Sequence, residues 1–426
     1  MKQRTAILIL TFSSILVPGQ MVDGGNGHAL ILDKAGNVWT VGRNNYGQLG
    51  DSTLENSAIP HKVKSLKNIV AVSRGYDHSI AIDANGCLFS WGRNNYGQLG
   101  CQSVNDQSTP QKLIGHENFI AVEGGHWHTV GLKKDSTVWS WGHNYFAELG
   151  NGTREHSPWP VSVIQVSNSG FSGLNNVISI ASVGYHTLAL KKDGTVWGWG
   201  GNTYNELGKK GDEFQQHAIR IEGIPVIKEI AAGWHHSVAL DHDGNIWVWG
   251  SDPAFQFKEE TKKCFERPTL LEGLPKFMKI ACGSWHSLAI DEDGNVWSWG
   301  KNNYGMLGTG DSLSHSEPVL LSSLKNIADI GCGCFQSIAV DSAGRIFTFG
   351  DNPAGQLGRG DFLRRYSPVL MALDIHGRSI NEILNKATVT EDPDKFEMLL
   401  RIAKYLLFVT SVLMNIVLYR KIRKIS

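Results

Sequence analysis

One pattern repeats seven times along this chain of 426 residues, at a step of fifty residues that is interrupted once by eight more. Its clearest mark is an aromatic residue or valine followed by glycine, and these glycines are Gly42, Gly92, Gly142, Gly200, Gly250, Gly300 and Gly350. Fourteen residues before each glycine is a histidine, replaced by Gln336 in the last copy, and these histidines are His28, His78, His128, His186, His236 and His286. A repeat of this length indicates a propeller, a solenoid or another array.

Each repeat is predicted to form about four short strands. His286–Ile290 alternates apolar with small or polar residues, which is the period of a pleated strand. Asp293-Gly294 then predicts a two-residue hairpin turn, and Asn295–Gly300 the returning strand. Apolar runs such as Ile327–Ile330 supply another strand, and a segment with proline in six of the seven copies supplies an edge strand, where proline is tolerated.

Seven such sheets predict an all-β fold, a seven-bladed β-propeller of four-stranded antiparallel blades over residues 19–373. Two positions on each returning strand form aromatic rows, which we expect to be buried between neighbouring blades. They hold Trp39 and Val41, Phe89 and Trp91, Trp139 and Trp141, Trp197 and Trp199, Trp247 and Trp249, Trp297 and Trp299, and Phe347 and Phe349. To close the ring, we expect Met21-Val22 to complete the blade that Pro368–Leu370 enters.

The motifs within the repeat resemble those of the regulator of chromosome condensation family. They read Gly-Tyr-Asp-His-Ser-Ile-Ala-Ile at Gly75–Ile82 and Trp-Gly-Arg-Asn-Asn-Tyr-Gly-Gln-Leu-Gly at Trp91–Gly100. The resemblance covers roughly residues 20–373 and implies a seven-bladed propeller. The founding member of that family looks like a nucleotide exchange factor for the Ran GTPase, so the resemblance implies nucleotide exchange as one candidate function. Other members share the fold but serve as interaction domains, scaffolds or a light sensor, so the fold alone does not assign a function.

Two repeats depart from the pattern. In the fourth, Val183 stands where the other repeats have glycine, three residues before the histidine or Gln336. This repeat also follows the eight extra residues, which fall within Trp159–Gly173. The other six repeats have a Leu-Gly pair eight residues after the Trp-Gly pair or its equivalent, such as Leu99-Gly100. The fifth repeat lacks this apolar turn and has a charged segment in its place. We predict partner binding by this segment, with a drifted solvated loop as the alternative, through Asp252, Lys258, Glu259, Glu260, Lys262 and Lys263. No repeat has extra residues directly after Trp-Gly, where the family's exchange factor carries a β-wedge.

No sequence motif predicts bond-making chemistry, so enzyme activity stays open only as guanine nucleotide exchange. The six phased histidines could be a ring of metal ligands. We interpret these histidines instead as architectural, each hydrogen-bonded to the backbone of its own blade. The tryptophans of the repeat are also interpreted as architectural, and these are Trp91, Trp141, Trp199, Trp249 and Trp299. The six cysteines form no Cys-x-x-Cys pair and are expected to be small buried hydrophobes. We expect no cofactor, no metal and no small-molecule substrate. A net charge of zero argues against binding to nucleic acid.

The chain after the last repeat predicts a membrane segment. Residues 374–391 form a linker, and residues 392–426 are predicted to be a helix with Asp392 as its N-cap and Pro393 in its first turn. A span at about 399–419 precedes Arg420, Lys421, Arg423 and Lys424, and residues 405–419 carry no charge. The alternative is a helix that lies at the membrane interface or docks on a partner.

The chain before the first repeat is also apolar. Lys2 and Arg4 precede the uncharged stretch Ala6–Val17, the order found in a secretory signal. We interpret residues 1–18 as a signal-like or anchoring segment, with a strand that closes the ring as the alternative.

Two classes of function follow. In the first, a membrane-anchored propeller faces the cytosol and binds a protein, most specifically a Ran-type GTPase or its regulators. In the second, a signal peptide exports the propeller, which serves as a membrane-tethered recognition or adhesion scaffold without a GTPase role.

Overall fold

The computed structural model describes residues 22–167, 170–251 and 264–379. These residues form thirty strands and no helix. The chain up to Gly377 is one compact unit, and Arg378–Ser426 form another, of which residues 378 and 379 are described. No helix among the described residues is long and apolar enough to cross a membrane. The predicted segments 1–18 and 392–426 lie outside the described residues, as does the linker beyond residue 379.

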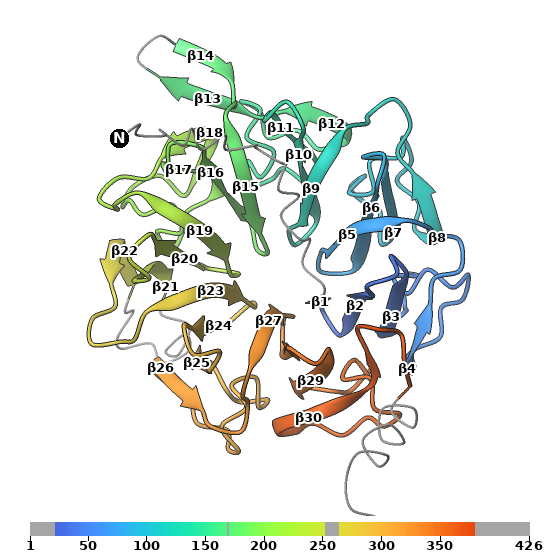
Figure 1. Ribbon diagram of the computed structural model, residues 1–426. Coiled ribbons are helices and arrows are strands. Elements are labelled where there is room, and N and C mark those ends of the chain that lie inside the picture. The colour runs from blue at the N-terminus through green and yellow to red at the C-terminus, as the bar shows by residue number, and fades with distance from the viewer. Residues whose placement is uncertain (1–21, 168–169, 252–263, 380–426) are drawn as a thin grey trace, which may run out of the picture. The chain divides into compact units, whose positions relative to one another are not determined.

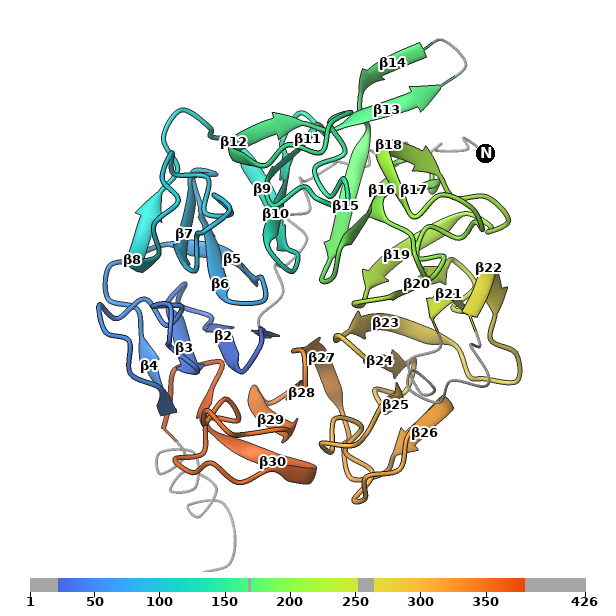
Figure 2. The same cartoon turned by 180° about the vertical axis from the view of Figure 1, so that it is seen from behind.

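The strands of the compact unit form seven sheets arranged in a ring (Figures 1 and 2), and the innermost strands of all seven line a central channel. Each sheet is one blade, and its strands run in sequence order from the channel to the rim. Blade 1 contains β1 (Val22–Gly24), β2 (His28–Leu32), β3 (Val38–Gly42) and β4 (Ser57–Lys62). Blade 2 contains β5 (Ile69–Arg74), β6 (His78–Asp83), β7 (Leu88–Gly92) and β8 (Gln107–Lys112). Blade 3 contains β9 (Phe119–Gly124), β10 (His128–Lys133), β11 (Val138–Gly142) and β12 (Ser157–Ser162).

The remaining four blades repeat this arrangement. Blade 4 contains β15 (Val177–Ser182), β16 (His186–Lys191), β17 (Val196–Gly201) and β18 (Phe214–Arg220). Blade 5 contains β19 (Ile227–Ala232), β20 (His236–Asp241), β21 (Ile246–Ser251) and β22 (Cys264–Leu270). Blade 6 contains β23 (Phe277–Cys282), β24 (His286–Asp291), β25 (Val296–Gly300) and β26 (His315–Leu321). Blade 7 contains β27 (Ile327–Cys332), β28 (Gln336–Asp341), β29 (Arg345–Gly350) and β30 (Arg365–Asp374).

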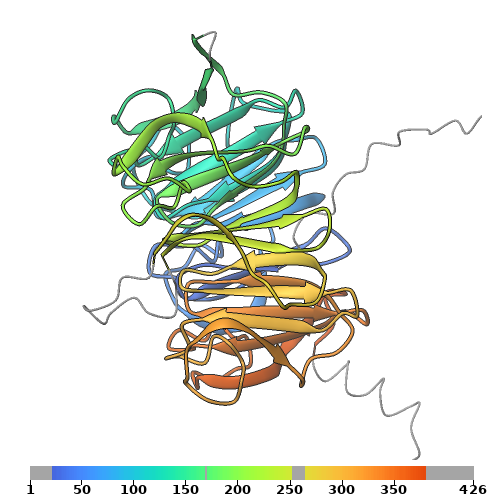
Figure 3. The ribbon, with the colours of Figure 1, turned by 90° about the vertical axis from the view of Figure 1, so that its left-hand side faces the viewer.

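The predicted seven-bladed propeller with four-stranded antiparallel blades is confirmed. Seen from its edge, the ring carries the loops between strands on two opposite faces (Figure 3). The hairpin turn differs from the prediction. Asp291 N–H donates to the carbonyl of Asn295 at 3.0 Å, so three residues form the loop, and of these only Gly294 has a positive φ, 75°. This is a three-residue loop that ends in a left-handed glycine, which the Asp-Gly pair alone does not distinguish from a two-residue turn.

The eight extra residues form a hairpin of their own. It consists of β13 (Ile164–Ser167) and β14 (Gly170–Gly173), and β13 joins the outer strand of blade 4 through a parallel pair, Gln165 with Ala218. Blade 4 thereby becomes part of a six-stranded sheet, and the hairpin projects from the rim of the ring (Figures 1 and 2).

The ring closes without a shared strand, so the prediction for Met21-Val22 is wrong. Val22 pairs with Ile31 inside blade 1, while blade 7 is completed by its own β30. The fifty-residue phase explains this, because Val22 lies fifty residues before Val72 in the innermost strand of blade 2. Blade 7 instead contacts blade 1 through Cys334 N–H, which donates to the carbonyl of Gly25 at 3.1 Å.

Only one of the two aromatic rows is fully buried between blades. Trp91, Trp141, Trp199 and Trp249 are completely covered, as are Val41 and Phe349 in the equivalent positions, and Trp299 is 2% exposed. Trp91 also donates its indole N–H to the carbonyl of Gln48 in the preceding blade, at 2.8 Å. The second row is half-buried, because its tryptophans turn back to cap their own hairpins. Trp297 Nε1 donates to Asp291 at 2.9 Å, and Trp39 Nε1 to Asp33 at 2.9 Å.

Candidate functional site at the mouth of the central channel

The innermost strand of each blade is joined to the second strand by a loop of three residues, as in Gly75-Tyr76-Asp77. The first residue of the loop is glycine in six of the seven blades, with Val183 in blade 4 as the exception, and in blade 2 the ring of the histidine that begins the second strand occupies the space beside this glycine. A Cβ on Gly75 would lie 1.9 Å from Cε1 of His78. The two following side chains therefore extend from the end of the blade close to the ring axis, where the loops of neighbouring blades meet.

The phased histidines join one blade to the next, which corrects the prediction that each bonds backbone within its own blade. His78 Nε2 lies 2.9 Å from Thr129 Oγ1 of blade 3, and His236 Nε2 lies 2.9 Å from Ser287 Oγ of blade 6. The hydroxyl of Thr129 in turn donates to the carbonyl of Gln98, so a second hydrogen bond joins blade 3 to blade 2. The equivalent imidazole–hydroxyl contacts join His28 to Ser79, His128 to Thr187, His186 to Ser237 and His286 to Ser337.

Backbone hydrogen bonds also link these loops around the channel. The N–H of Tyr76 donates to the carbonyl of Gly125 at 3.2 Å, and the N–H of His126 to the carbonyl of Gly184 at 3.0 Å. The N–H of Trp234 donates in the same way to the carbonyl of Ser284 at 3.1 Å. The loops thus form a hydrogen-bonded collar that fixes the position of the side chains at this end of the channel.

Seven aromatic side chains of these loops form a continuous surface, which we call the mouth cluster. Its members are Tyr76, His126, Trp127, Tyr185, Trp234, His235 and Trp285. They come from five consecutive blades, 2 to 6. His126 is buried at 6% exposure, and the other six are partly exposed.

The rings of the mouth cluster contact one another across the channel. The ring centroid of His126 lies 4.1 Å from that of Trp127, 4.3 Å from that of Tyr76 and 5.2 Å from that of Trp234. Trp234 lies 5.0 Å from Trp285 and 6.0 Å from Tyr76. Since Tyr76 belongs to blade 2 and Trp234 to blade 5, these contacts cover this end of the channel with aromatic surface.

Charged and polar side chains surround the mouth cluster. The guanidinium of Arg93 lies over the rings of Tyr46 and Trp127, at 4.8 and 5.6 Å from their centroids, and Lys301 lies 5.6 Å from that of Trp285. Such cation–π contacts hold the cations against the rings at the protein surface. His235 is oriented by Glu206, whose carboxylate lies 3.0 Å from Nδ1.

Burial changes the protonation of two members of the mouth cluster. The pKa of His126 is lowered to about 3, first by removal from water and then by neighbouring positive groups such as His143 and Arg93. Burial also raises the pKa of the Tyr185 hydroxyl to about 12. Both side chains are therefore neutral at pH 7, so His126 packs as an uncharged ring against Trp127.

The arrangement is suited to binding a protein. Among the described residues, no group of three or more histidine, cysteine or carboxylate side chains is placed to hold a metal ion. The phased histidines direct their Nε2 atoms at hydroxyls of the next blade, where they support the ring. Partly exposed tyrosine and tryptophan beside arginine are the residue types enriched at the centre of protein interfaces.

The predicted partner-binding segment of blade 5 lies outside the described residues, with Asp252, Lys258, Glu259, Glu260, Lys262 and Lys263. The mouth cluster was not predicted as a site, because its residues alternate between two repeat positions. His126 and Trp234 stand two residues before a phased histidine, while Trp127 and Trp285 stand one residue before it. Reading both columns over all seven repeats would have shown the aromatic excess.

A protein-family model described as the RCC1-like domain matches residues 13–277 and 105–390 of the chain. The chain belongs to the RCC1-like domain family. A search of curated protein sequences finds no match to it.

Solved structures of other proteins share the RCC1-like fold. Prp20p from Saccharomyces cerevisiae is 28% identical, with a TM-score of 0.63 over 73% of this chain and 80% of that chain; the study of that structure concerns its binding to Gsp1p and histones. Yeast RCC1 (Prp20) bound to Kap60 is 26% identical, with a TM-score of 0.64 over 74% of this chain and 78% of that one. Human WBSCR16 is 23% identical, with a TM-score of 0.67 over 75% of this chain and 86% of that chain, and indicates the fold alone.

Proposed function

We propose that this propeller is a protein-interaction module whose mouth cluster binds the partner, and that a Ran-type small GTPase or one of its regulators is that partner. The observation that carries the first part is the continuous, partly exposed aromatic surface on a rigid ring, bordered by Arg93 and Lys301. The likeness to Prp20p, a protein studied for its binding to Gsp1p, supports the second part.

Binding of the full chain to a Ran-type GTPase, nucleotide-free and loaded with GDP, tests this proposal. Trp127→Ala combined with Trp285→Ala removes two half-buried indoles and is expected to weaken binding at least tenfold, or about 1.4 kcal/mol. Trp159→Ala is the matched control, because Trp159 is 47% exposed on β12 at the rim. Equal binding by all three proteins, each with an unchanged melting temperature, would contradict the mouth cluster as the binding site.

Exchange activity is the finer form of this proposal. It would act by distorting the nucleotide pocket of the GTPase, so it requires no acid–base chemistry from the propeller. The rate of GDP release measures it directly. Release that is no faster with the protein than without it, while the two still bind, leaves an interaction module without exchange activity.

The charged segment of blade 5 remains a second proposed contact. Replacing Lys258, Lys262 and Lys263 with Glu is expected to weaken partner binding and to leave the melting temperature nearly unchanged, because the segment replaces an apolar turn by charges. A large loss of thermal stability with intact binding would show that the segment supports the fold instead.

The alternative function is an exported, membrane-tethered recognition or adhesion scaffold. The signal-like sequence of residues 1–18 favours it, whereas the predicted span at about 399–419 fits both functions. Protease protection of the propeller in sealed membranes, with N-terminal sequencing of the mature chain, separates the two functions. A protected propeller that has lost residues 1–18 would exclude the GTPase, and one that proteases reach from the cytosolic side would support it.

A further inference from the structure

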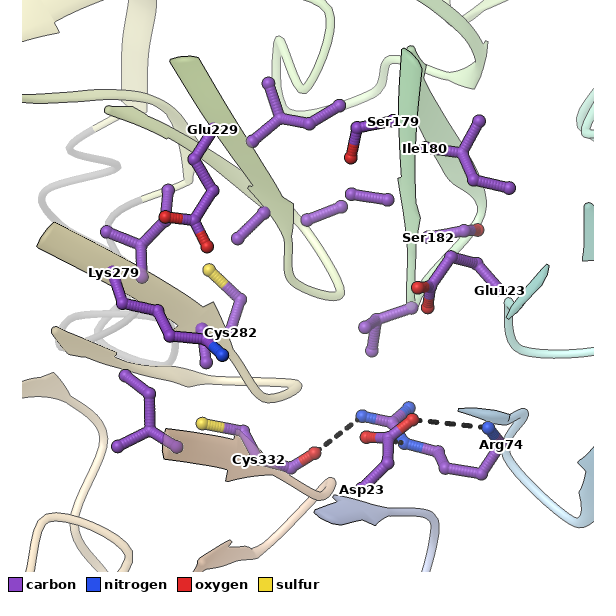
Figure 4. Close-up of a pocket in the computed structure, with 18 residues that line it drawn as sticks. Asp23, Arg74, Glu123, Ser179, Ile180, Ser182, Glu229, Lys279, Cys282 and Cys332 are labelled. Atoms are coloured by element: carbon purple, nitrogen blue, oxygen red, sulfur yellow. Dashed lines mark hydrogen bonds and ion pairs between the residues drawn. The ribbon is translucent and has the colours of Figure 1, made fainter. Parts of the chain in front are cut away.

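The channel beneath the mouth cluster contains a cavity of about 230 Å³. Its wall is built from the innermost strands of all seven blades, and it combines apolar side chains such as Ile180 and Ile280 with charged ones. Figure 4 shows the carboxyl groups of Glu123 and Glu229 pointing into this space from opposite sides.

The charges around the cavity do not balance. Four carboxyl groups, those of Asp23, Glu123, Glu229 and Asp329, accompany two cations, Arg74 and Lys279. Arg74 pairs with Asp23, with 3.2 Å between Nε and Oδ1, and also donates to the carbonyl of Cys332 at 2.8 Å. Lys279 pairs with Asp329. Both cations are therefore already paired with a carboxylate.

Glu123 and Glu229 are the two carboxyl groups without a cation. Within the part of the chain that the structure describes, neither forms an ion pair. Glu123 accepts a hydrogen bond from the hydroxyl of Ser73 at 3.2 Å, and Glu229 accepts one from the backbone N–H of Ile280. Each carboxylate thus keeps acceptor capacity that faces the cavity.

The surroundings of these two carboxyl groups disfavour their charged form while the cavity holds no cation. Burial, followed by repulsion from Asp23, raises the pKa of Glu123 to about 8 despite the attraction of Arg74. Burial also raises the pKa of Glu229 to about 7, against the opposing effects of Lys279 and Lys228. A bound cation would favour ionisation of both groups, so binding and proton release are coupled.

We propose that this cavity binds a cation of the alkylammonium or guanidinium class between Glu123 and Glu229. The two carboxylates provide the charge, and the apolar wall around Ile180, Ala231 and Ile280 packs against the alkyl part of the ligand. The mouth cluster covers one end of the channel, so the cation enters from the opposite end and passes Glu229. Glu229 lies on β19, four residues before Gly233, where the loop that carries Trp234 begins. At about 3.3 Å per residue, this places Glu229 roughly 13 Å from that loop along the channel.

Two sources could supply this chemistry, a small molecule or the lysine or arginine side chain of a protein, and calorimetry of the full chain distinguishes them. The probes are 1,4-diaminobutane, agmatine, and an uncharged-terminus peptide with one central arginine. Binding of the free amines alone assigns a small-molecule site. Binding of the peptide alone assigns a side-chain receptor. The absence of binding by all three probes at millimolar concentration overturns the proposal.

The pH and two variants identify the residues. Affinity is expected to fall at least tenfold from pH 8.5 to pH 6, and binding at pH 7 is expected to release protons, seen as a heat that depends on the buffer. Glu123→Gln and Glu229→Gln keep the shape of the side chains and are each expected to weaken binding at least tenfold. Glu222→Gln, at an exposed position outside the channel, is the control. Unchanged affinity in both channel variants, with unchanged melting temperatures, would also overturn the proposal, whatever the outcome for the mouth cluster.

Discussion

The phased histidine, taken as a single residue, is a joint between two blades. The hydroxyl of Ser79 donates to the carbonyl of Gln48, so it can only accept from the ring of His28, which must carry its proton on Nε2. The same logic applies to His78, because Thr129 donates to the carbonyl of Gln98. These imidazoles therefore donate from Nε2, and burial keeps them neutral at pH 7. Their pKa values are lowered to about 3, primarily by burial.

Gly75, three residues before His78, lies directly against the ring of its joint, whereas blade 4 forms the same joint with Val183 at this position. We predict that Gly75→Ala destabilises the fold by about 1–3 kcal/mol, the range for overpacking, because its Cβ would lie 1.9 Å from the His78 ring. Gly173→Ala is the control for the substitution itself, since its φ is not positive and the nearest atom to a Cβ there is Ser162 Oγ at 3.6 Å. Chemical denaturation measures both.

A double variant tests the cause of the Gly75 effect. His78→Ala removes the ring, so adding Gly75→Ala to it should cost much less than Gly75→Ala costs alone. Equal costs in the two backgrounds would mean that the ring is not the reason for the glycine.

Among the elements, the hairpin β13–β14 is an addition to a blade that is otherwise complete. It begins after Val163 and ends before Leu174, whose N–H donates to the carbonyl of Val163 at 2.8 Å. In blade 1 the N–H of Leu66 donates to the carbonyl of Val63 at 3.3 Å across only two residues. The hairpin therefore replaces a short turn without changing its ends.

Replacing residues 164–173 by Lys-Ser, the two residues of the blade 1 turn, is predicted to leave the propeller folded. The melting temperature should change by no more than a few degrees, because the hairpin joins blade 4 through the pair of Gln165 with Ala218, the Lys191–Gln165 hydrogen bond and the contact of the Phe171 and His217 rings, and Phe171 is 69% exposed. Circular dichroism and thermal unfolding measure this. A loss of cooperative unfolding would show that the hairpin is part of the core.

The repeat predicted the elements well because it reports backbone geometry, and it predicted contacts poorly because these depend on neighbouring blades. The spacing of the glycines predicted the seven blades. The same fifty-residue spacing would also have placed Val22 in the innermost strand of blade 1. It could not show that His78 bonds to Thr129, fifty-one residues later, since both positions recur in every blade. The mouth cluster was missed for a similar reason, because Tyr76 and Trp234 meet only when the ring closes.

At the scale of the whole molecule, the ring combines two sets of buried groups whose protonation acts in opposite directions. The six histidine joints have lowered pKa values, and these residues are His28, His78, His128, His186, His236 and His286. Glu123 and Glu229 have raised values, about 8 and about 7. The balance between the two sets decides how the stability of the propeller depends on pH.

We predict that the propeller loses stability as the pH falls below about 6.5, the pKa of an unfolded histidine. Below that pH the unfolded chain binds protons at seven histidines that stay neutral in the fold, the six joints and His126, so acid favours unfolding. The two glutamates oppose this, since they bind protons in the fold between their ordinary pKa, 4.5, and about 7 or 8. Seven histidines against two glutamates leave a net uptake of about five protons on unfolding near pH 5.5, or roughly 7 kcal/mol per pH unit at most.

Unfolding free energies measured between pH 5 and pH 8 give this proton uptake as a slope. His286→Gln is the informative variant, because blade 7 has Gln336 at the same position, where its Nε2 donates to the carbonyl of His28 at 2.9 Å. This substitution is expected to reduce the uptake by about one proton while the ring still closes. If the slope is the same in both proteins, or if stability rises towards pH 5, the histidine joints are not what makes the ring sensitive to acid.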